Sequence, residues 1–456
     1  MTSKAADAKL LEVLKPSEAG FEKAWRALCE RQATRATEAQ QAEASELIAK
    51  VRTGGDRALR SWSRSTTGLN LDPLEVTADE WDAACESVDP AVRAALGKAA
   101  MRIREFHRKR VPSSWEMREE GGGYMGQRLR PFSRVAFVAS TEGTLTPTNL
   151  IMSVTPPSAV EVPHILVAAP VQKDGTVSPE LLMAARIAGV HRVYKLCGPA
   201  AVAAFAYGTP LIERVDKIVL EADAELDYAR SQLTGRVGFC GGGSGPREMC
   251  LVADKTAQPA WVAADLLAHA ETGRRAQTVV ITHVRSLATK IQEQLAKQIK
   301  KLDSSRVAQQ SLASSGTVIL TPNVETSIAL AEEYAPEKLV LAVQKPEPLA
   351  KTLSHAGEIF MGHYTPPALG EFLAGPSASR DSGGRARFES AFGVEDFLKR
   401  TNFIQFEAPK LRELGLEAVR LAESADLSGH GTSVELRLQK IRRVRREREQ
   451  AREAEF

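Results

Sequence analysis

The feature that most constrains this fold is an alternation of short apolar runs and helical patterns between residues 134 and 361. The first part predicts strands at 134–138, 164–169, 192–196 and 217–220, and helices at 179–188, 200–206 and 224–233. The second part predicts strands at 249–253, 277–282, 316–321, 339–343 and 358–361, and helices at 259–271, 285–300, 304–314, 324–334 and 347–355. Apolar strands that alternate with helices indicate parallel sheets covered on both faces. We therefore predict an α/β fold with two Rossmann-like units in tandem.

The segments outside this alternation have a different character. Residues 1–50 and 78–108 predict helices, and the Gly- and Pro-containing stretch 109–133 predicts a loop or hairpin at a domain boundary. After residue 394 we expect helix to the end. Residues 437–456 carry eight basic and four acidic residues. This tail is either a solvated helix or a surface for an acidic partner; we do not expect nucleic acid there, because stacking aromatics are scarce.

Composition limits the class of protein. A chain of 456 residues is too long for one ordinary core, and 43% hydrophobic with 26% charged residues is typical of a globular protein. The five cysteines are scattered without CxxC spacing, so we expect neither a disulfide framework nor a zinc ribbon. We find no signal peptide and no apolar run long enough to cross a bilayer, so we expect a cytoplasmic location and no membrane partner.

Candidate chemistry begins in the stretch from Asp265 to Thr272. It ends a predicted helix that starts near Pro259, and His269 and Thr272 lie three residues apart on one face of it. This polar pair is either part of a site or an ordinary helix end, where a partly exposed histidine is favoured by the helix dipole. The glycine run at 241–245 lacks the spacing of a dinucleotide fingerprint and predicts a loop.

Several stretches, in this order and spacing, together resemble the histidinol dehydrogenase family. They lie at 203–209, 215–218, 244–248 with 252–254, 265–271, 333–339, 356–362, 384–388 and 396–400. The resemblance covers residues from about 40 to 440. It implies two incomplete Rossmann-like domains with helical N- and C-terminal segments, intertwined in a homodimer. The corresponding domains are a helical segment 1–35, a first Rossmann-like domain 36–116 with 248–380, a second at 117–247, and a dimerisation segment with a basic tail at 381–456.

The resemblance also implies an activity: oxidation of L-histidinol to L-histidine through an aldehyde, in two NAD-dependent steps, with a zinc ion that orients the small polar substrate. The family's zinc helix, Gln-Ala-Glu-His, matches the run from His269 to Thr272. His269 therefore replaces the glutamine ligand, and Thr272 replaces the histidine ligand. The Gly-Asp ligand matches Glu371, and a histidine from the partner subunit matches His430. His269, Glu371 and His430 form a set suited to zinc with an open position. The alternative is that they persist as polar residues of a vestigial pocket.

The family's catalytic Glu-His pair matches Glu337 and Lys338. Glu337 would activate water, and Lys338 would be an altered acid/base. Histidine titrates near neutral pH, whereas lysine, with an ordinary pKa of about 10.4, serves as a base only where its surroundings depress that pKa strongly. The alternative is a simple ion pair between Glu337 and Lys338.

The NAD-facing turns also depart from the family pattern. One such turn is Gly-Gly-Ala-Gln in the family, and Ala200 replaces its glutamine here. The other is Gly-Pro-Gly-Asn in the family; here it is Leu-Glu-Ala-Asp and ends at Asp223. Ala200 and Asp223 are therefore the candidate cofactor-binding positions. Loss of both glycines restricts a close backbone approach, and Glu221 with Asp223 brings negative charge to the place of a pyrophosphate.

Two functional hypotheses follow from this pattern. The chain is either a histidinol dehydrogenase-like oxidoreductase for L-histidinol or a related small polar amino alcohol, or a catalytically inactive homologue that serves as a dimeric binding or assembly protein. Stretches that look structural match the family, whereas positions at the chemistry are mostly replaced. NAD binding at the turn that ends with Asp223 distinguishes the two hypotheses.

Overall fold

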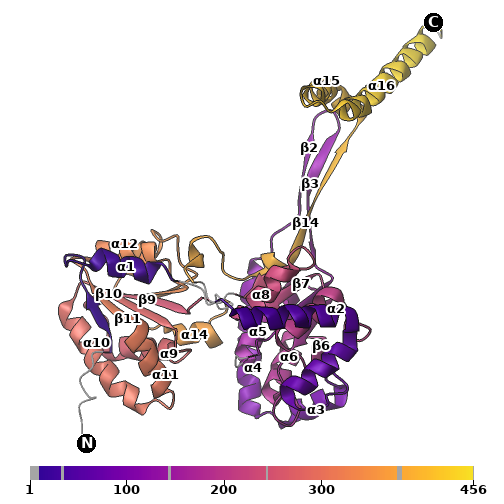
Figure 1. Cartoon of the computed structure of the whole chain (residues 1–456). Coiled ribbons are helices and arrows are strands. Elements are labelled where there is room, and N and C mark those ends of the chain that lie inside the picture. The colour runs from indigo at the N-terminus through magenta and orange to yellow at the C-terminus, as the bar shows by residue number, and fades with distance from the viewer. Residues whose placement is uncertain (1–9, 32–34, 142–144, 243–244, 377–382, 455–456) are drawn as a thin grey trace, which may run out of the picture. The chain divides into compact units, whose positions relative to one another are not determined.

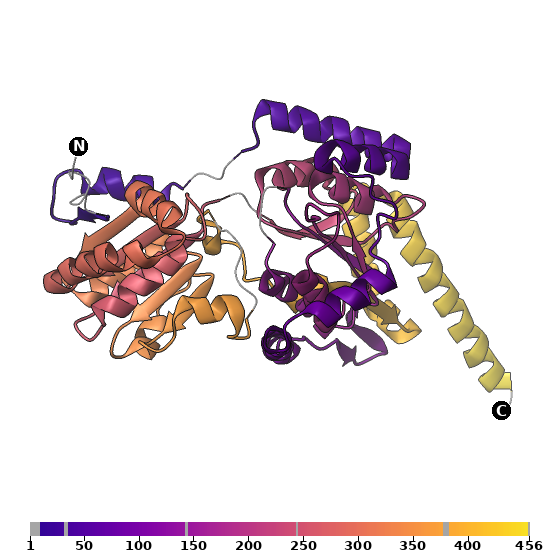
Figure 2. The same cartoon turned by 90° about the horizontal axis from the view of Figure 1, so that it is seen from below.

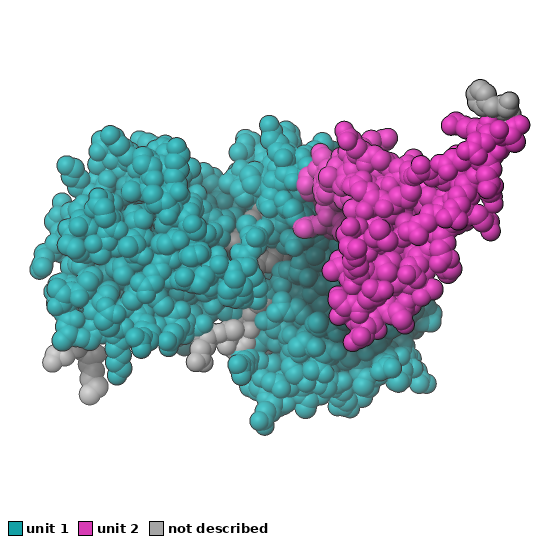
Figure 3. Space-filling view, turned by 90° about the horizontal axis from the view of Figure 1, so that it is seen from above, with its two compact units in different colours: residues 1–111, 131–397 teal, residues 112–130, 398–456 magenta. Residues whose placement is uncertain are grey.

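The computed structural model describes residues 10–31, 35–141, 145–242, 245–376 and 383–454. The chain divides into two compact units (Figure 3). Unit 1 comprises Met1–Val111 and Pro131–Phe397, and unit 2 comprises Pro112–Arg130 and Leu398–Phe456. Unit 1 contains two parallel sheets, each covered by helices on both faces, as the sequence predicts. The predicted α/β class is therefore confirmed.

The larger sheet of unit 1 has six strands in the order β1-β11-β10-β9-β12-β13 (Figure 1). All its pairs are parallel. Its strands are β1 (Glu12–Leu14), β9 (Glu248–Ala253), β10 (Gln277–Thr282), β11 (Gly316–Leu320), β12 (Lys338–Ala342) and β13 (Glu358–Met361). The five strands that the sequence predicts have the Rossmann order, in which the first strand is central. β1 extends the edge beyond β11; it is too short to be recognised within a segment that we predicted to be helical.

The smaller sheet repeats this order with five strands, β6-β5-β4-β7-β8. They are β4 (Arg134–Val138), β5 (His164–Ala168), β6 (Arg192–Tyr194), β7 (Lys217–Leu220) and β8 (Gly238–Gly241). The chain runs outward from β4 through β5 to β6 and then returns to place β7 on the other side of β4. In sheets of this kind ligands bind where the strand order reverses, outside the carboxyl ends of the strands. That position here lies between β4 and β7.

Helices cover both faces of the larger sheet (Figures 1 and 2). On one face Phe21 and Trp25 of α1 (Phe21–Cys29) and Ile328 of α12 (Val324–Tyr334) share a core with alternate strand residues. On the other face the core includes Leu266 and Leu312. That face is covered by α9 (Pro259–Ala270), α10 (Arg285–Gln298) and α11 (Ser305–Ser315). The short helices α13 (Pro346–Ala350) and α14 (Pro367–Phe372) flank β13.

The smaller sheet is covered by helices from two parts of the chain. They are α2 (Glu38–Thr67), α3 (Ala78–Ser87), α4 (Pro90–Lys109), α5 (Pro147–Ala159), α6 (Pro179–Ala188), α7 (Gly198–Tyr207) and α8 (Ala224–Leu233). Ile48, Val51 and Leu59 of α2 lie in the core of this sheet. This differs from our grouping of residues 36–116 with 248–380: the apolar face of α2 packs against α7 and α8 instead.

Unit 2 is a three-stranded sheet with two helices. The predicted hairpin forms as β2 (Trp115–Glu119) and β3 (Gly123–Pro131), and β14 (Leu398–Phe406) pairs with β3. The chain continues as α15 (Ala408–Ser424) and the long α16 (Ser428–Ala454). Our expectation of helix throughout after residue 394 is wrong at β14, because its Thr, Ile and Phe residues favour a strand. Among the described helices, none has an apolar stretch sufficient to span a bilayer.

Candidate functional site

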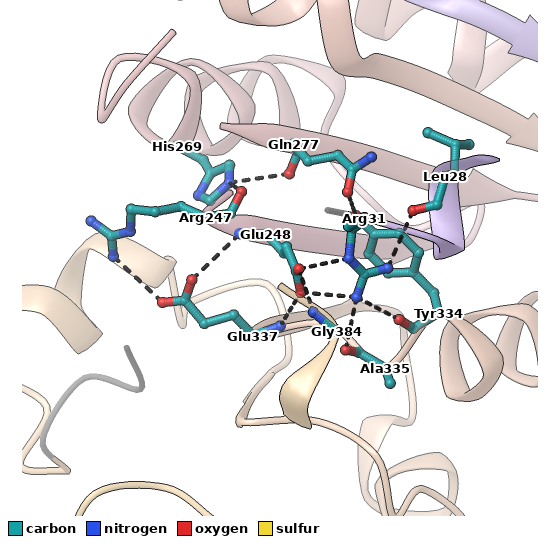
Figure 4. A network of polar contacts seen from close by, with 10 residues as sticks. All are labelled: Leu28, Arg31, Arg247, Glu248, His269, Gln277, Tyr334, Ala335, Glu337 and Gly384. Atoms are coloured by element: carbon teal, nitrogen blue, oxygen red, sulfur yellow. Dashed lines mark hydrogen bonds and ion pairs between the residues drawn. The ribbon is translucent and has the colours of Figure 1, made fainter. Parts of the chain in front are cut away.

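A network of buried polar side chains lies at the amino edge of the larger sheet (Figure 4). Glu248 is the first residue of β9, Gln277 the first of β10 and Lys338 the first of β12. Because the amino ends of parallel strands meet at one edge, these residues come together there. Glu248 and Glu337 are 0% exposed and Lys338 is 1% exposed. Burial of so many ionisable groups is costly unless they are paired, so their partners decide what the site can do.

Glu248 is held by a buried ion pair with Arg31, which follows α1. Nε of Arg31 lies 2.6 Å from one carboxylate oxygen of Glu248, and Nη2 lies 2.9 Å from the other. Arg31 also donates to the carbonyl oxygen of Tyr334 and lies over its ring. Glu248 further accepts from the backbone N–H groups of Gly384 and Glu337. Arg31 was not predicted, because no motif marks it; Glu248 belongs to one of the resembling stretches.

A second carboxylate, Glu371 on α14, is paired with two cations. Lys338 donates to Oε1 of Glu371, and Arg247 Nη2 lies 3.2 Å from the same atom. Burial opposes ionisation of Glu371, but the charges of Lys338 and Arg247 outweigh it and lower the pKa to about 2. Arg247 Nη2 also lies 3.6 Å from Glu337. Lys338 thus pairs with Glu371 rather than with its neighbour Glu337, which corrects the simple ion pair that we considered.

His269 lies in the last turn of α9, which begins at Pro259 as predicted. Its Nε2 lies 3.3 Å from the carbonyl oxygen of Arg247 and 3.2 Å from that of Gln277, so Nε2 carries the proton and donates to both. Burial, with the charges of Lys338 and Arg247, lowers its pKa to about 3. His269 is therefore neutral and buried, not a partly exposed cation at a helix end.

Thr272 does not share a site with His269. Its hydroxyl donates to the carbonyl oxygen of His269 at 2.8 Å, which satisfies one of the free carbonyl groups at the end of α9. Helical spacing alone predicted a shared face, but the side chain of Thr272 closes the helix end. The departure from the family pattern at Thr272 therefore has a local structural use.

The residues that the resemblance assigns to zinc do not fit a divalent cation. His269 and Glu371 are close enough for their charges to interact. His430, which the resemblance assigns to the partner subunit's site, is exposed in the first turn of α16. Nδ1 of His269 is buried and, among the described residues, has no hydrogen-bond partner, so its lone pair is free there. However, its imidazole faces the cations Lys338 and Arg247, and these already pair with Glu371. Among the residues that the structure describes, no three His, Cys, Asp or Glu side chains are grouped as metal ligands.

The carboxyl edge of the smaller sheet carries the predicted NAD-facing residues. Glu221 accepts from the backbone N–H of Ser140 at 2.8 Å, and Asp223 accepts from the Ser140 hydroxyl at 2.6 Å. Asp223 also caps α8 by accepting from the N–H groups of Glu225 and Leu226. Ala200 is 0% exposed, and its methyl group belongs to the core rather than to this edge. The two carboxylates occupy the reversal point between β4 and β7, so this edge does not present the glycine backbone that the resemblance implies.

A hollow of about 330 Å³ lies beside the Arg31 network. Tyr334, Ala335 and Gly384 contribute both to its wall and to the contacts around Arg31 and Glu248. The rest of the wall is mainly charged and consists of Glu22, Trp25, Arg26, Cys29, Glu30, Glu333 and Arg387. Its size and polarity suit a small polar molecule.

Comparison with known proteins identifies relatives of this chain over most of its length. The family model for histidinol dehydrogenase matches residues 29–438. The histidinol dehydrogenase of Oceanobacillus iheyensis is 35% identical over 391 residues, which cover 86% of this chain and 91% of the relative. That of Thermosynechococcus vestitus is 35% identical over 420 residues, which cover 91% of this chain and 96% of the relative.

A solved structure agrees with the fold. The crystal structure of histidinol dehydrogenase from Elizabethkingia anophelis superposes with a TM-score of 0.88 at 24% identity, covering 95% of this chain and 99% of that one. It supports the two-sheet architecture, while the sequence relatives and the family model establish descent. The chain belongs to the histidinol dehydrogenase family.

Proposed function

We propose that this protein is an NAD-dependent oxidoreductase that acts as a homodimer on L-histidinol or a related small polar amino alcohol, through an aldehyde. Family membership supports this reaction class, because the relatives named above are histidinol dehydrogenases. The observation that carries it for this chain is Glu337, which stays at the catalytic position of the resemblance. It is buried at the start of β12 with Arg247 at 3.6 Å.

The reaction has two oxidations, and each removes one hydride from carbon. In the first, the alcohol loses a hydride and its hydroxyl proton to give the aldehyde. Water then adds to the aldehyde, and the hydrate loses a second hydride and one hydroxyl proton to give the carboxylic acid. NAD would supply the hydride acceptor for both oxidations.

Residues of the chain would accept the proton and stabilise the charge that develops in the reaction. Glu337, as a carboxylate, takes a proton from the water that adds to the aldehyde. Lys338 and Arg247 provide N–H donors beside Glu371 that stabilise negative charge on the substrate oxygen. Because Glu337 is 0% exposed and Lys338 is 1% exposed, a substrate reaches them only when the residues that cover them move.

The burial and pairing of these residues favour a second candidate, a catalytically inactive homologue that binds a ligand or assembles as a dimer. Lys338 donates its hydrogen bond to Glu371, and at the other sheet Glu221 and Asp223 accept hydrogen bonds from Ser140. In this case the fold is retained for recognition, and the hollow beside Arg31 is the binding surface.

Calorimetric titration with NAD, followed by a turnover assay with L-histidinol that records NADH absorbance, distinguishes the candidates. The oxidoreductase should bind NAD and form two NADH per histidinol. Glu337→Gln should lower kcat by roughly 10²-fold or more, because the carboxamide cannot take the proton from water. Glu347→Gln, at an exposed glutamate of α13, is the matched control and should keep wild-type turnover.

Each result selects a candidate. Turnover that depends on Glu337 but not on Glu347 supports the oxidoreductase. Equal turnover of both variants removes Glu337 from the mechanism. A dimer that neither binds NAD nor oxidises L-histidinol or other amino alcohols is the inactive homologue.

A further inference from the structure

We infer that Lys338 and Arg247 supply the positive charge of the buried site from within the chain, and that the site holds no divalent metal ion. The inference concerns the charges at the amino edge of the larger sheet. It holds whether the protein is the oxidoreductase or the inactive homologue.

The first argument is that Glu371 already has its cations. Its Oε1 accepts from Lys338, whose side chain is 1% exposed, and lies 3.2 Å from Nη2 of Arg247. A metal ion that used this carboxylate would have to displace a buried ammonium group. That displacement would leave Lys338 charged in the interior without its partner, which is unfavourable.

The second argument is charge balance. Among the described residues of the network, Glu248, Glu337 and Glu371 are carboxylates, and Arg31, Arg247 and Lys338 are cations that contact them. Each of these three carboxylates therefore already contacts a cation of the chain. A divalent ion would add two positive charges to an enclosed site, where unbalanced charge is costly.

The third argument concerns the histidine. Nε2 of His269 is committed to the carbonyl oxygens of Arg247 and Gln277. Nδ1 has no partner among the residues that the structure describes, but the imidazole is close to Lys338 and Arg247, whose charges repel a cation. The nitrogen therefore offers one ligand in a place where the electrostatic potential opposes metal binding.

The experiment is a metal analysis of the full-length protein after dialysis against zinc chloride and then metal-free buffer. We expect far less than one zinc per chain, and a Tm that changes neither with added zinc nor with a chelator. Stoichiometric zinc, or a Tm that falls on chelation, would overturn the inference. NAD binding and turnover are recorded separately, so failure of the proposed function does not affect this readout.

A variant tests whether Lys338 is the residue that excludes the metal ion. Lys338→Met removes one cation and leaves Glu371 with excess negative charge, so zinc should raise the Tm of this variant by several degrees. Lys290→Met, at an exposed lysine of α10, is the matched control and should show no response. A zinc response in wild type overturns the inference. Equal lack of response in wild type and Lys338→Met overturns the assignment of metal exclusion to Lys338.

Discussion

Removal of the Arg31 guanidinium should destabilise the larger sheet of unit 1 severely. The Arg31 and Glu248 side chains are 1% and 0% exposed and are joined by two short contacts of 2.6 and 2.9 Å. Arg31→Met keeps much of the side-chain volume but leaves the Glu248 carboxylate with backbone donors in place of a cation. Loss of one partner from a buried pair costs about 3–5 kcal/mol, and we expect a decrease of that size in the free energy of unfolding.

Urea unfolding at neutral pH, followed by far-UV circular dichroism and tryptophan fluorescence, measures this decrease. Trp25, one of five tryptophans, is buried with its ring centroid 6.0 Å from that of Tyr334, so part of the fluorescence reports on the region around Arg31. Arg26→Met is the matched control, because Arg26 is an exposed arginine on α1. Surface substitutions of this kind usually change stability by less than about 0.5 kcal/mol.

Two further variants separate charge from geometry. Arg31→Lys keeps the positive charge but loses the planar fork, so it should recover only part of the lost stability. In a double-mutant cycle, Arg31→Met with Glu248→Gln should cost less than the sum of the single changes, because only the double variant leaves no lone charge of this pair buried. The reasoning is refuted if Arg31→Met is as stable as Arg26→Met, or if the cycle shows no coupling.

Three other variants test the site and its supports. Glu371→Gln should lower the free energy of unfolding by about 2–3 kcal/mol at pH 7. Because the folded pKa of Glu371 is about 2, below its ordinary 4.5, this difference from wild type should shrink as pH falls below 4.5. A difference that does not change with pH contradicts the ion pair with Lys338. Burial raises the pKa of Asp265 to about 7 from 3.8, so this carboxyl destabilises the fold as pH rises from 4 to 7. Over that range the free energy of unfolding of Asp265→Asn, measured by urea titration, should rise by about 2–4 kcal/mol relative to that of wild type. Equal pH profiles of the two proteins would contradict this prediction. Gly370→Ala places a methyl group 2.6 Å from the Phe360 ring and should lower the free energy of unfolding, measured by calorimetry, by about 1–3 kcal/mol. An unchanged Tm would show that the ring can move freely.

The fold followed from local pattern because the parallel strands are buried on both faces. A run such as Thr278–Thr282 in β10 has to be apolar along most of its length, and its flanking helices have their own period and capping residues. β1 and β14 were missed for opposite reasons. β1 has only three residues within a segment of helical composition, and the nine residues of β14 are mostly exposed and show little alternation.

The site was less predictable, because its pairings join distant residues. The match of Glu337 and Lys338 to a catalytic pair located the amino edge of the sheet, but it did not show that Lys338 would select Glu371. Arg31 reaches Glu248 across 217 positions of sequence, and no local signal marks it. Asp223 was predicted as a cofactor-binding position from its place in a turn, whereas its carboxylate caps α8. Identity of a side chain at a motif position therefore does not reveal which partner neutralises it.

The three-stranded sheet of unit 2 has a consequence for synthesis of the chain. β3 ends at Pro131, but its partner β14 begins at Leu398, after both parallel sheets have been translated. At roughly 5–20 residues per second, the hairpin emerges some tens of seconds before its third strand. During that interval one edge of β3 offers unpaired N–H and C=O groups to other nascent chains. Lys410 of α15 then joins this helix to Glu119 of β2 by an ion pair, so unit 2 is completed last, when the C-terminal segment arrives.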